Sequence, residues 1–138
     1  MMSEGDAVTT PGVRDSDPWT STEPGIPLFM NVTLTIKPER LEESLAALRE
    51  VLPAARAEPN CIYLHVGQSM TDPAVFVLSE AWQDRVEYRD TILPKPYFQA
   101  YLQISESTYA QPRRVVLLTP VELADSPAQA SPSARSTR

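Results

Sequence analysis

Residues 28–36 read LFMNVTLTI, and their side chains alternate between a purely apolar set and a mixed set. A two-residue period is typical of a β-strand with one buried face. The apolar set is Leu28, Met30, Val32, Leu34 and Ile36. The period then lengthens, because Pro38 suits the first position of a helix and leucines recur at helical spacing from Leu41 to Leu52. This order predicts a strand and then an amphipathic helix, which Pro53 either ends or kinks.

The following segments again contain a strand followed by a helix, with two additional strands. In chain order they are a strand at 61–69, a strand at 74–82, a helix in two pieces and a strand at 115–118. Asp72 and Pro73 favour a tight turn, so they predict that the first two of these strands form a hairpin. Pro94 and Pro96 cannot both lie inside one regular helix, so a second helical piece is expected to begin near Pro96.

The predicted order is therefore strand, helix, strand, strand, helix, strand. The order divides into two halves, each with a strand, a helix and a strand. When the two halves share one four-stranded antiparallel sheet with both helices on one face, they form the βαββαβ ferredoxin-like α+β sandwich. The other face of the sheet would expose Phe29, Tyr63, Val75 or Val77, and a second subunit would cover this apolar patch. We expect a homodimer in which the two copies form a dimeric α/β barrel.

One domain, at residues 27–121, is expected between two tails. Residues 1–26 and 122–138 are rich in Ser, Thr, Asp and Pro and show no hydrophobic periodicity. Such segments bury too little apolar surface to offset the entropy of ordering, so both are predicted to be flexible. Trp19 is the exception in the first tail, where it is either loosely packed or docked on the domain or a partner.

Charge and composition exclude several classes of partner. The net charge of -6 falls largely on the first 27 residues, and the absence of a basic patch argues against nucleic acid. No apolar run approaches the length of a membrane span, and the N-terminus lacks the apolar region of a signal peptide. Cys61 is the single cysteine, which excludes a disulfide framework within the chain and fits a reducing compartment. We expect a cytoplasmic protein without a membrane partner.

The string FVLSEAWQDRVEYRD, followed by PYFQAY, resembles the antibiotic biosynthesis monooxygenase family of small dimeric ferredoxin-like proteins. The resemblance covers about residues 27–121. Trp82 and Tyr88, six positions apart, match the tryptophan and tyrosine of members that oxidise a polyketide phenol with O₂ and use neither metal nor flavin. Asn31 resembles the strand asparagine that haem-degrading members pair with this tryptophan. The resemblance thus implies Asn31, Trp82 and Tyr88 as catalytic residues.

The sequence also departs from the family. Many quinol-oxidising and haem-degrading relatives have a histidine near the positions of Thr91 or Ile92, and often another at Tyr97, whereas this chain has none there. The departure argues against haem ligation and against a histidine-based mechanism. His65, the only histidine, becomes a candidate base or haem ligand if its strand face lines the cavity.

The aromatic residues suit an oxidation in which the substrate supplies the electrons. Trp82 and Tyr88 offer flat apolar surfaces for an aromatic ligand and one hydrogen-bond donor each, and Asn31 would orient an oxygen atom. The substrate-binding candidates are His65, Tyr97, Phe98 and Tyr101. For each of these residues, packing in the core is the alternative. Glu80 is a further candidate base, because alternation places it on one face with Leu78 and Trp82.

The sequence therefore predicts a homodimeric, cofactor-independent monooxygenase that oxidises an aromatic polyketide or quinol with O₂. No metal is expected, because the chain has no His or Cys cluster. Phosphate binding is not expected either, because the chain has no glycine-rich loop. The alternative is a non-catalytic member of the family that binds a ligand or only dimerises. A haem-binding or haem-degrading protein is the third hypothesis.

Overall fold

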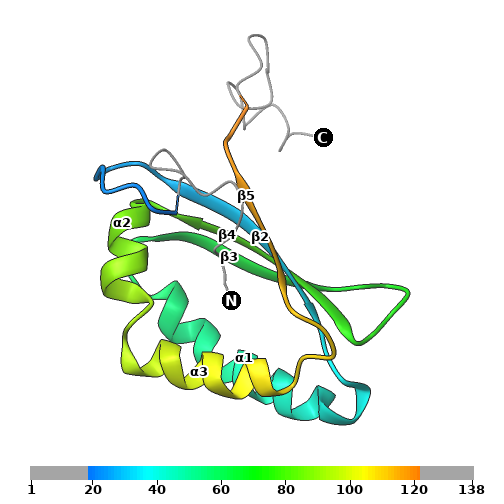
Figure 1. Ribbon diagram of the computed structural model, residues 1–138. Helices are drawn as coiled ribbons and strands as arrows, with labels where there is room; N and C mark the ends of the chain where they lie inside the picture. The colour runs from blue at the N-terminus through cyan, green and yellow to red at the C-terminus, as the bar shows by residue number, and fades with distance from the viewer. Residues whose placement is uncertain (1–18, 122–138) are drawn as a thin grey trace, which may run out of the picture.

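The computed structural model describes residues 19–121 and confirms the ferredoxin-like α+β sandwich (Figure 1). The strands are β2 (Leu28–Thr35), β3 (Cys61–Gln68), β4 (Val75–Trp82) and β5 (Arg114–Leu118). They form one sheet in the order β3-β4-β2-β5, and all neighbouring pairs are antiparallel. The predicted tail at 122–138 and most of the predicted tail at 1–26 lie outside the described residues.

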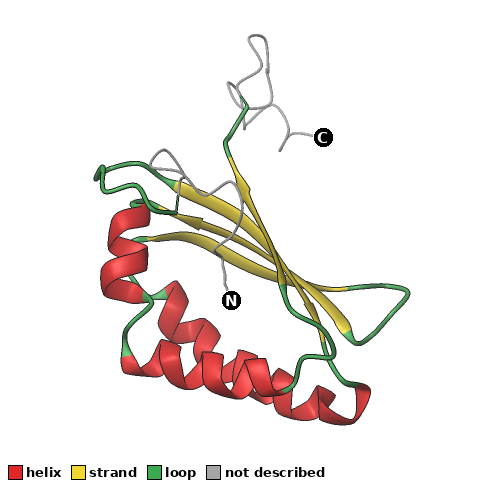
Figure 2. Cartoon of the chain, viewed as in Figure 1, coloured by secondary structure: helices red, strands yellow, loops and turns green. Residues whose placement is uncertain are grey.

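Helices α1 (Leu41–Arg56) and α3 (Pro96–Ser107) cover one face of the sheet and leave the other face open (Figure 2). A short 3-10 turn, η1 (Pro38–Arg40), leads into α1, and Pro38 occupies the first turn as predicted. Helix α1 continues through Pro53 to Arg56, so this proline does not end the helix. Both Pro53 and Arg49 one turn earlier are exposed, so water can satisfy the carbonyl group that the proline cannot bond.

The second helical region is divided into pieces, as its prolines require. Helix α2 (Arg85–Glu87) begins at Asp84, whose Oδ1 accepts hydrogen bonds from the backbone N–H groups of Val86 at 2.9 Å and Glu87 at 3.2 Å. This is the usual way to satisfy the first donors of a helix. A π-helical turn, η2 (Tyr88–Ile92), follows, and α3 starts anew at Pro96.

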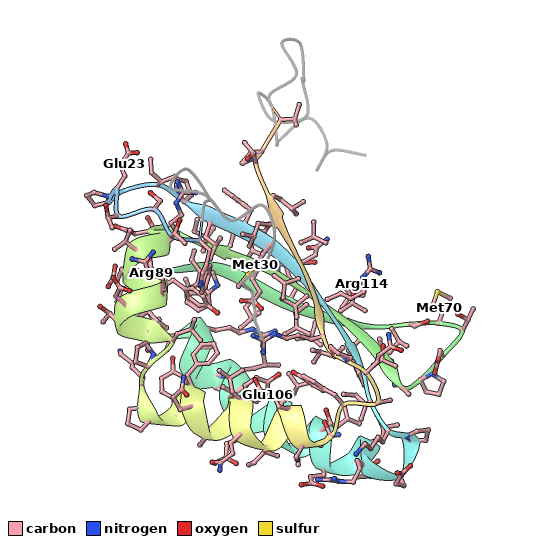
Figure 3. The ribbon with its side chains drawn as sticks, viewed as in Figure 1. Glu23, Met30, Met70, Arg89, Glu106 and Arg114 are labelled. Carbon is pink, nitrogen blue, oxygen red and sulfur yellow. The ribbon has the colours of Figure 1, made fainter. Side chains whose placement is uncertain are left out.

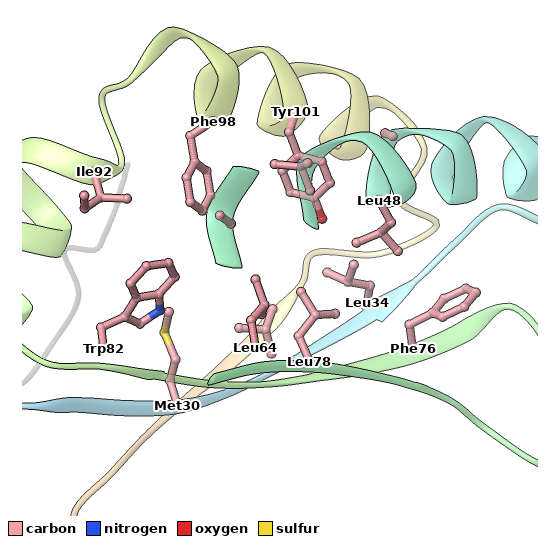
Figure 4. Packing of buried hydrophobic residues seen from close by; sticks show 14 of the residues in the cluster. Met30, Leu34, Leu48, Leu64, Phe76, Leu78, Trp82, Ile92, Phe98 and Tyr101 are labelled. Atoms are coloured by element: carbon pink, nitrogen blue, oxygen red, sulfur yellow. The ribbon is translucent and has the colours of Figure 1, made fainter. Parts of the chain in front are cut away.

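The core lies between the sheet and the helices, where the two hydrophobic patterns meet. On β2 the even-numbered residues from Leu28 to Leu34 are buried, and on β4 the buried set includes Phe76, Leu78 and Trp82. Figure 4 shows these side chains rising from the sheet toward Phe98 and other residues of the helices. The alternation read from the sequence therefore assigned the buried face of the central strands correctly.

The opposite face of the sheet carries exposed apolar side chains, as expected. Tyr63, Val77, Val116 and Leu118 on this face are between 36% and 45% exposed. We call this surface, together with the neighbouring odd-numbered residues of β2, the open face. It is an apolar patch of the kind that monomeric proteins rarely leave uncovered.

Substitution of Leu34 tests the inward face of β2. Leu34 is 1% exposed, so Leu34→Ala should lower the free energy of unfolding by about 2–5 kcal/mol, through lost burial and the cavity left behind. Thr33→Ala, which alters the neighbouring residue on the open face, should cost no more than about 1 kcal/mol. Urea unfolding followed by circular dichroism measures both, and equal losses would contradict the assignment of faces.

Candidate functional site

A cavity of about 720 Å³ lies between the inner face of the sheet and the helices. Its lining is largely apolar: Met30, Val32, Leu34, Leu64 and Leu78 come from the central strands, and Leu48, Val51, Leu52, Ala55, Phe98, Tyr101 and Leu102 come from α1 and α3. Four further lining residues are exposed, namely Trp19, Thr20, Arg113 and Val115. They mark the mouth of the cavity. Its volume and apolar wall suit a small aromatic molecule.

Glu80 is the only carboxylate among the described residues that line the cavity. It lies on the inner face of β4, between Met30 of β2 and Leu64 of β3 in the register of the sheet, and is 7% exposed. Burial raises the pKa of the Glu80 carboxyl, and this effect outweighs the hydrogen bond from Trp82 and the positive charge of Arg113, which both lower it. A group with such a pKa can hold or release a proton nearer neutrality than an ordinary glutamate.

Trp82 holds Glu80 in place. The indole Nε1 of Trp82 donates a hydrogen bond to Oε1 of Glu80 at 3.0 Å. The two side chains meet because residues two apart on a strand share one face. Trp82 is fully buried and is not among the described residues that line the cavity, so its direct partners are Glu80 and the ring of Tyr88, whose centroid lies 4.6 Å away. Among the described residues, Trp82 therefore adjoins the cavity only through Glu80 and Tyr88.

Tyr88 and Tyr101 bring phenol groups to the cavity wall. Phe98 lies between them, with ring centroids 6.1 Å from Tyr88 and 6.4 Å from Tyr101, both in edge-on geometry. Burial raises the pKa of Tyr88 well above its ordinary value and that of Tyr101 to about 12. Both phenols are therefore protonated at neutral pH and are able to donate hydrogen bonds into the cavity.

Arg113 supplies the only positive charge among the described lining residues. It precedes β5 and lies at the mouth, where its Nη1 is 3.4 Å from Oε2 of Glu106. This ion pair is long and both side chains are exposed, so it contributes little to stability. The guanidinium is consequently available to a ligand, and the cavity carries one negative group inside and one positive group at its entrance.

Asn31 does not lie on the same face of the sheet as Trp82 and does not share the cavity with Tyr88. It is exposed on the open face, opposite Ser79 of β4 and Val116 of β5 in the register. The reason is strand alternation: Met30 and Val32 point to the helices, so the residue between them must point away. The resemblance to family members suggested that Asn31 contacts Trp82, whereas the alternation of side chains along the strand already indicated that Asn31 faces away from the helices.

His65 also lies on the open face. It is exposed and stacks on Tyr63 with ring centroids 5.0 Å apart and planes 12° apart. Within one chain it therefore contacts neither Glu80 nor the cavity. This position removes the condition under which His65 was expected to act as a base or haem ligand.

Of the three aromatic residues expected to wall the pocket, Phe98 and Tyr101 line the cavity and Tyr97 does not appear among the described lining residues. The hydroxyl of Tyr97 instead donates to Oε2 of Glu58 at 2.8 Å, and Lys95 Nζ also bonds this carboxylate at 3.0 Å. Desolvation and the bond to Glu58 raise the pKa of Tyr97. Tyr97 thus joins α3 to the end of α1.

Sequence reasoning left the importance of Glu80 undecided and missed Arg113, Trp19 and Thr20 as lining residues. A charged residue at an inward position of a central strand was the available signal for Glu80. No comparable signal marks Arg113, because it lies in a connection whose path depends on how α3 returns to β5. Among residues 19–121 there is no group of three His, Cys, Asp or Glu side chains placed to hold a metal ion.

The fold defines a ferredoxin-like α+β protein with a cavity between sheet and helices. Residues 27–102 match the antibiotic biosynthesis monooxygenase family, and the chain belongs to that family. A crystal structure of an antibiotic biosynthesis monooxygenase is similar to it with a TM-score of 0.65 and 28% identity, over 69% of this chain and 99% of the other. Within the described part, no helix is long and apolar enough to cross a membrane.

Two further proteins are similar to this chain, one in structure and one in sequence. Rv0793 from Mycobacterium tuberculosis is similar with a TM-score of 0.64 and 21% identity, over 72% of this chain and 99% of its own. An uncharacterized protein of Synechocystis, sll1783, is 26% identical over 89 residues, which are 64% of this chain. The match spans only 60% of that relative. The first of these likenesses supports the fold alone.

Glu80→Gln tests the burial of the carboxyl without changing its shape. Because the folded state raises the pKa of Glu80, it binds a proton more tightly than the unfolded state does. The stability of the wild type should fall, relative to Glu80→Gln, as pH rises through the interval between the unfolded and folded pKa values. The difference is about 1.4 kcal/mol for each pKa unit between them.

Guanidinium unfolding of both proteins between acid and slightly alkaline pH measures this difference. Glu50→Gln, on the exposed side of α1, is the matched control and should follow the wild-type profile. Parallel profiles for wild type and Glu80→Gln would show that the carboxyl of Glu80 is not perturbed by the fold.

Proposed function

We propose that this protein is a cofactor-independent monooxygenase that oxidises an aromatic phenol, of the polyketide or quinol type, with O₂ in the cytoplasm. The observation that carries the proposal is a single buried carboxylate, Glu80, at the wall of an apolar cavity of about 720 Å³. The family and the similar solved monooxygenase support the reaction class. The finer assignment to Glu80 comes from the geometry of this chain.

Glu80 is the proposed proton acceptor. The ionised carboxylate takes the phenolic proton, and the phenolate then passes one electron to O₂, which gives a phenoxyl radical and superoxide. Their combination forms a carbon–oxygen bond to the ring, and the proton returns from Glu80 to the peroxide. Loss of the ring proton then breaks the oxygen–oxygen bond, so that phenol and O₂ yield quinone and water. One oxygen atom of O₂ enters the ring and the other leaves as water.

The remaining lining residues fit the charges that arise in these steps. The guanidinium of Arg113 lies at the mouth, where it would stabilise the phenolate or an anionic substituent of the substrate. Tyr88 and Tyr101 keep their protons at neutral pH and would donate hydrogen bonds to substrate oxygens. Trp82 acts through Glu80, since its hydrogen bond favours the carboxylate form that accepts the proton.

We further propose that the protein works as a homodimer joined through the open face. The support is the apolar surface there, where Val77, Val116 and Leu118 are each at least 38% exposed. Asn31 and His65 lie on the same face, so a second copy would cover them. In that assembly they would serve the interface rather than the cavity of their own chain.

Quinone formation tests the reaction. Purified protein with O₂ and a dihydroxyanthracene that has a free carbon on its central ring should form the quinone faster than buffer does. Isotopically labelled O₂ should place one labelled atom in the product. Glu80→Gln should lower kcat by about 100-fold or more, because it removes the general base.

Trp82→Phe distinguishes a positioning role from a direct one. It should lower kcat at neutral pH by about tenfold and move the acid limb of the pH–rate profile to higher pH, because the lost hydrogen bond had lowered the pKa of Glu80. An unshifted pH–rate profile would contradict the proposal that Trp82 acts through the pKa of Glu80. Equal rates for wild type and buffer would instead favour the non-catalytic binding or dimerisation module.

Val116→Asp tests the dimer. A charge buried without a partner in the interface should weaken dimerisation by about 100-fold, measured by light scattering or sedimentation across a dilution series. Met70→Asp introduces the same charge at a fully exposed methionine of the β3–β4 connection and should leave the dimer intact. A monomeric wild type at high concentration would overturn this proposal.

A further inference from the structure

Residues 19–26 precede the region that matches the family and yet reach the ligand cavity. The sequence suggested a flexible tail here, but Trp19 and Thr20 both line the cavity at its mouth. Trp19 is 37% exposed, and its ring meets that of Tyr88 edge-on, with centroids 6.3 Å apart. The segment therefore adds one aromatic side chain, Trp19, from outside the matched family region to the aromatic residues that the region itself contributes to the cavity wall.

Arg89 binds the N-terminal part of this segment. Its Nη1 donates hydrogen bonds to the backbone carbonyl oxygens of Trp19 at 2.7 Å and of Ser21 at 2.8 Å. Its other nitrogens bond the carboxylate of Asp90 at 2.7 Å and 3.0 Å, which holds the guanidinium in position. Figure 3 shows Arg89 at the side of the domain where Glu23 of the segment also lies.

A second set of bonds fixes the end of the segment to the start of α2. The backbone N–H of Gly25 donates to Oδ2 of Asp84 at 3.0 Å, and the N–H of Arg85 donates to the carbonyl oxygen of Ile26 at 2.9 Å. Gly25 has a φ of 82°, so the turn that brings its N–H to Asp84 suits glycine. Asp84 thus caps α2 with one oxygen and binds the segment with the other.

These contacts link the segment to the cavity wall through neighbouring residues. Arg89, which holds the backbone of Trp19, follows Tyr88, which lines the cavity and packs on the Trp19 ring. A displacement of the segment would consequently uncover Tyr88 and widen the mouth. Single hydrogen bonds to backbone carbonyl groups at or near the surface are weak enough to break and re-form during ligand exchange.

We propose that residues 19–26 form a strap across the cavity mouth, that Trp19 contacts the bound aromatic ring, and that Arg89 sets how fast the ligand leaves. The proposal rests on the aromatic-ligand part of the proposed function and does not depend on the oxidation. In the proposed oxidation, the strap would close the mouth and keep water away from the radical and peroxide species.

The test uses 2-naphthol as the probe and the full chain under nitrogen, so that no oxidation takes place. Release of the probe is followed by its own fluorescence after rapid dilution. Arg89→Ala and Trp19→Ala should each release it about tenfold faster than wild type. Arg49→Ala is the matched control, because Arg49 is an exposed arginine of α1 that is not among the described lining residues. This variant should release 2-naphthol at the wild-type rate.

A second measurement reports Trp19 directly. The chain has two tryptophans, so Trp82→Phe leaves Trp19 as the single emitter. Its emission should be quenched by 2-naphthol, and adding Arg89→Ala should shift the emission to longer wavelength and weaken the quenching. Unchanged emission and an unchanged release rate in the Arg89 variants would overturn the strap.

The outcomes separate this proposal from the proposed function. If 2-naphthol binds and its release depends on Arg89 and Trp19, but no quinone forms in air, the proposed oxidation is contradicted and the proposed strap is supported. Quinone formation with release that ignores Arg89 and Trp19 would overturn the strap alone. Failure of the wild type to bind 2-naphthol at all would overturn both.

Discussion

Alternation of side chains along β2 and β4 is the constraint on which the rest of this structure depends. Each residue of the two central strands faces either the helices or the open side of the sheet, and no intermediate position exists. The inward set builds the core and the cavity, and it includes Glu80 and Trp82. The outward set includes Asn31 and builds an apolar surface for a partner. A shift of one residue in either strand would exchange the two sets and destroy both surfaces.

The burial of Glu80 costs free energy that its surroundings restore only in part. A carboxylate between Met30 and Leu64 loses its hydration, and one indole N–H and the more distant Arg113 charge restore only part of that loss. A simple core would place an apolar residue there. In the proposed oxidation, the carboxylate at this position would accept the phenolic proton beside the cavity.

The cavity is bounded by parts of the chain that lie far apart in the sequence. Its floor comes from the central strands, its roof from α1 and α3, and its mouth from Arg113 and the segment at 19–26. The mouth lies outside the matched family region on both sides of the chain, before residue 27 and after residue 102. Residues of loops and connections, rather than those of the matched region, therefore line the mouth.

The sequence by itself determined the element order, the sheet with helices on one face and the inward position of Glu80, since local periodicity and prolines specify these features. Phe98 and Tyr101 were also assigned to the cavity wall in advance. Only the tertiary structure decided that Trp82 lies outside the described lining of the cavity, that Tyr97 turns to Glu58, and that Arg113 and Trp19 reach the mouth. The positions of Tyr97, Arg113 and Trp19 bring together residues from separate segments, and they depend on packing distances and loop paths that no local pattern of side chains encodes.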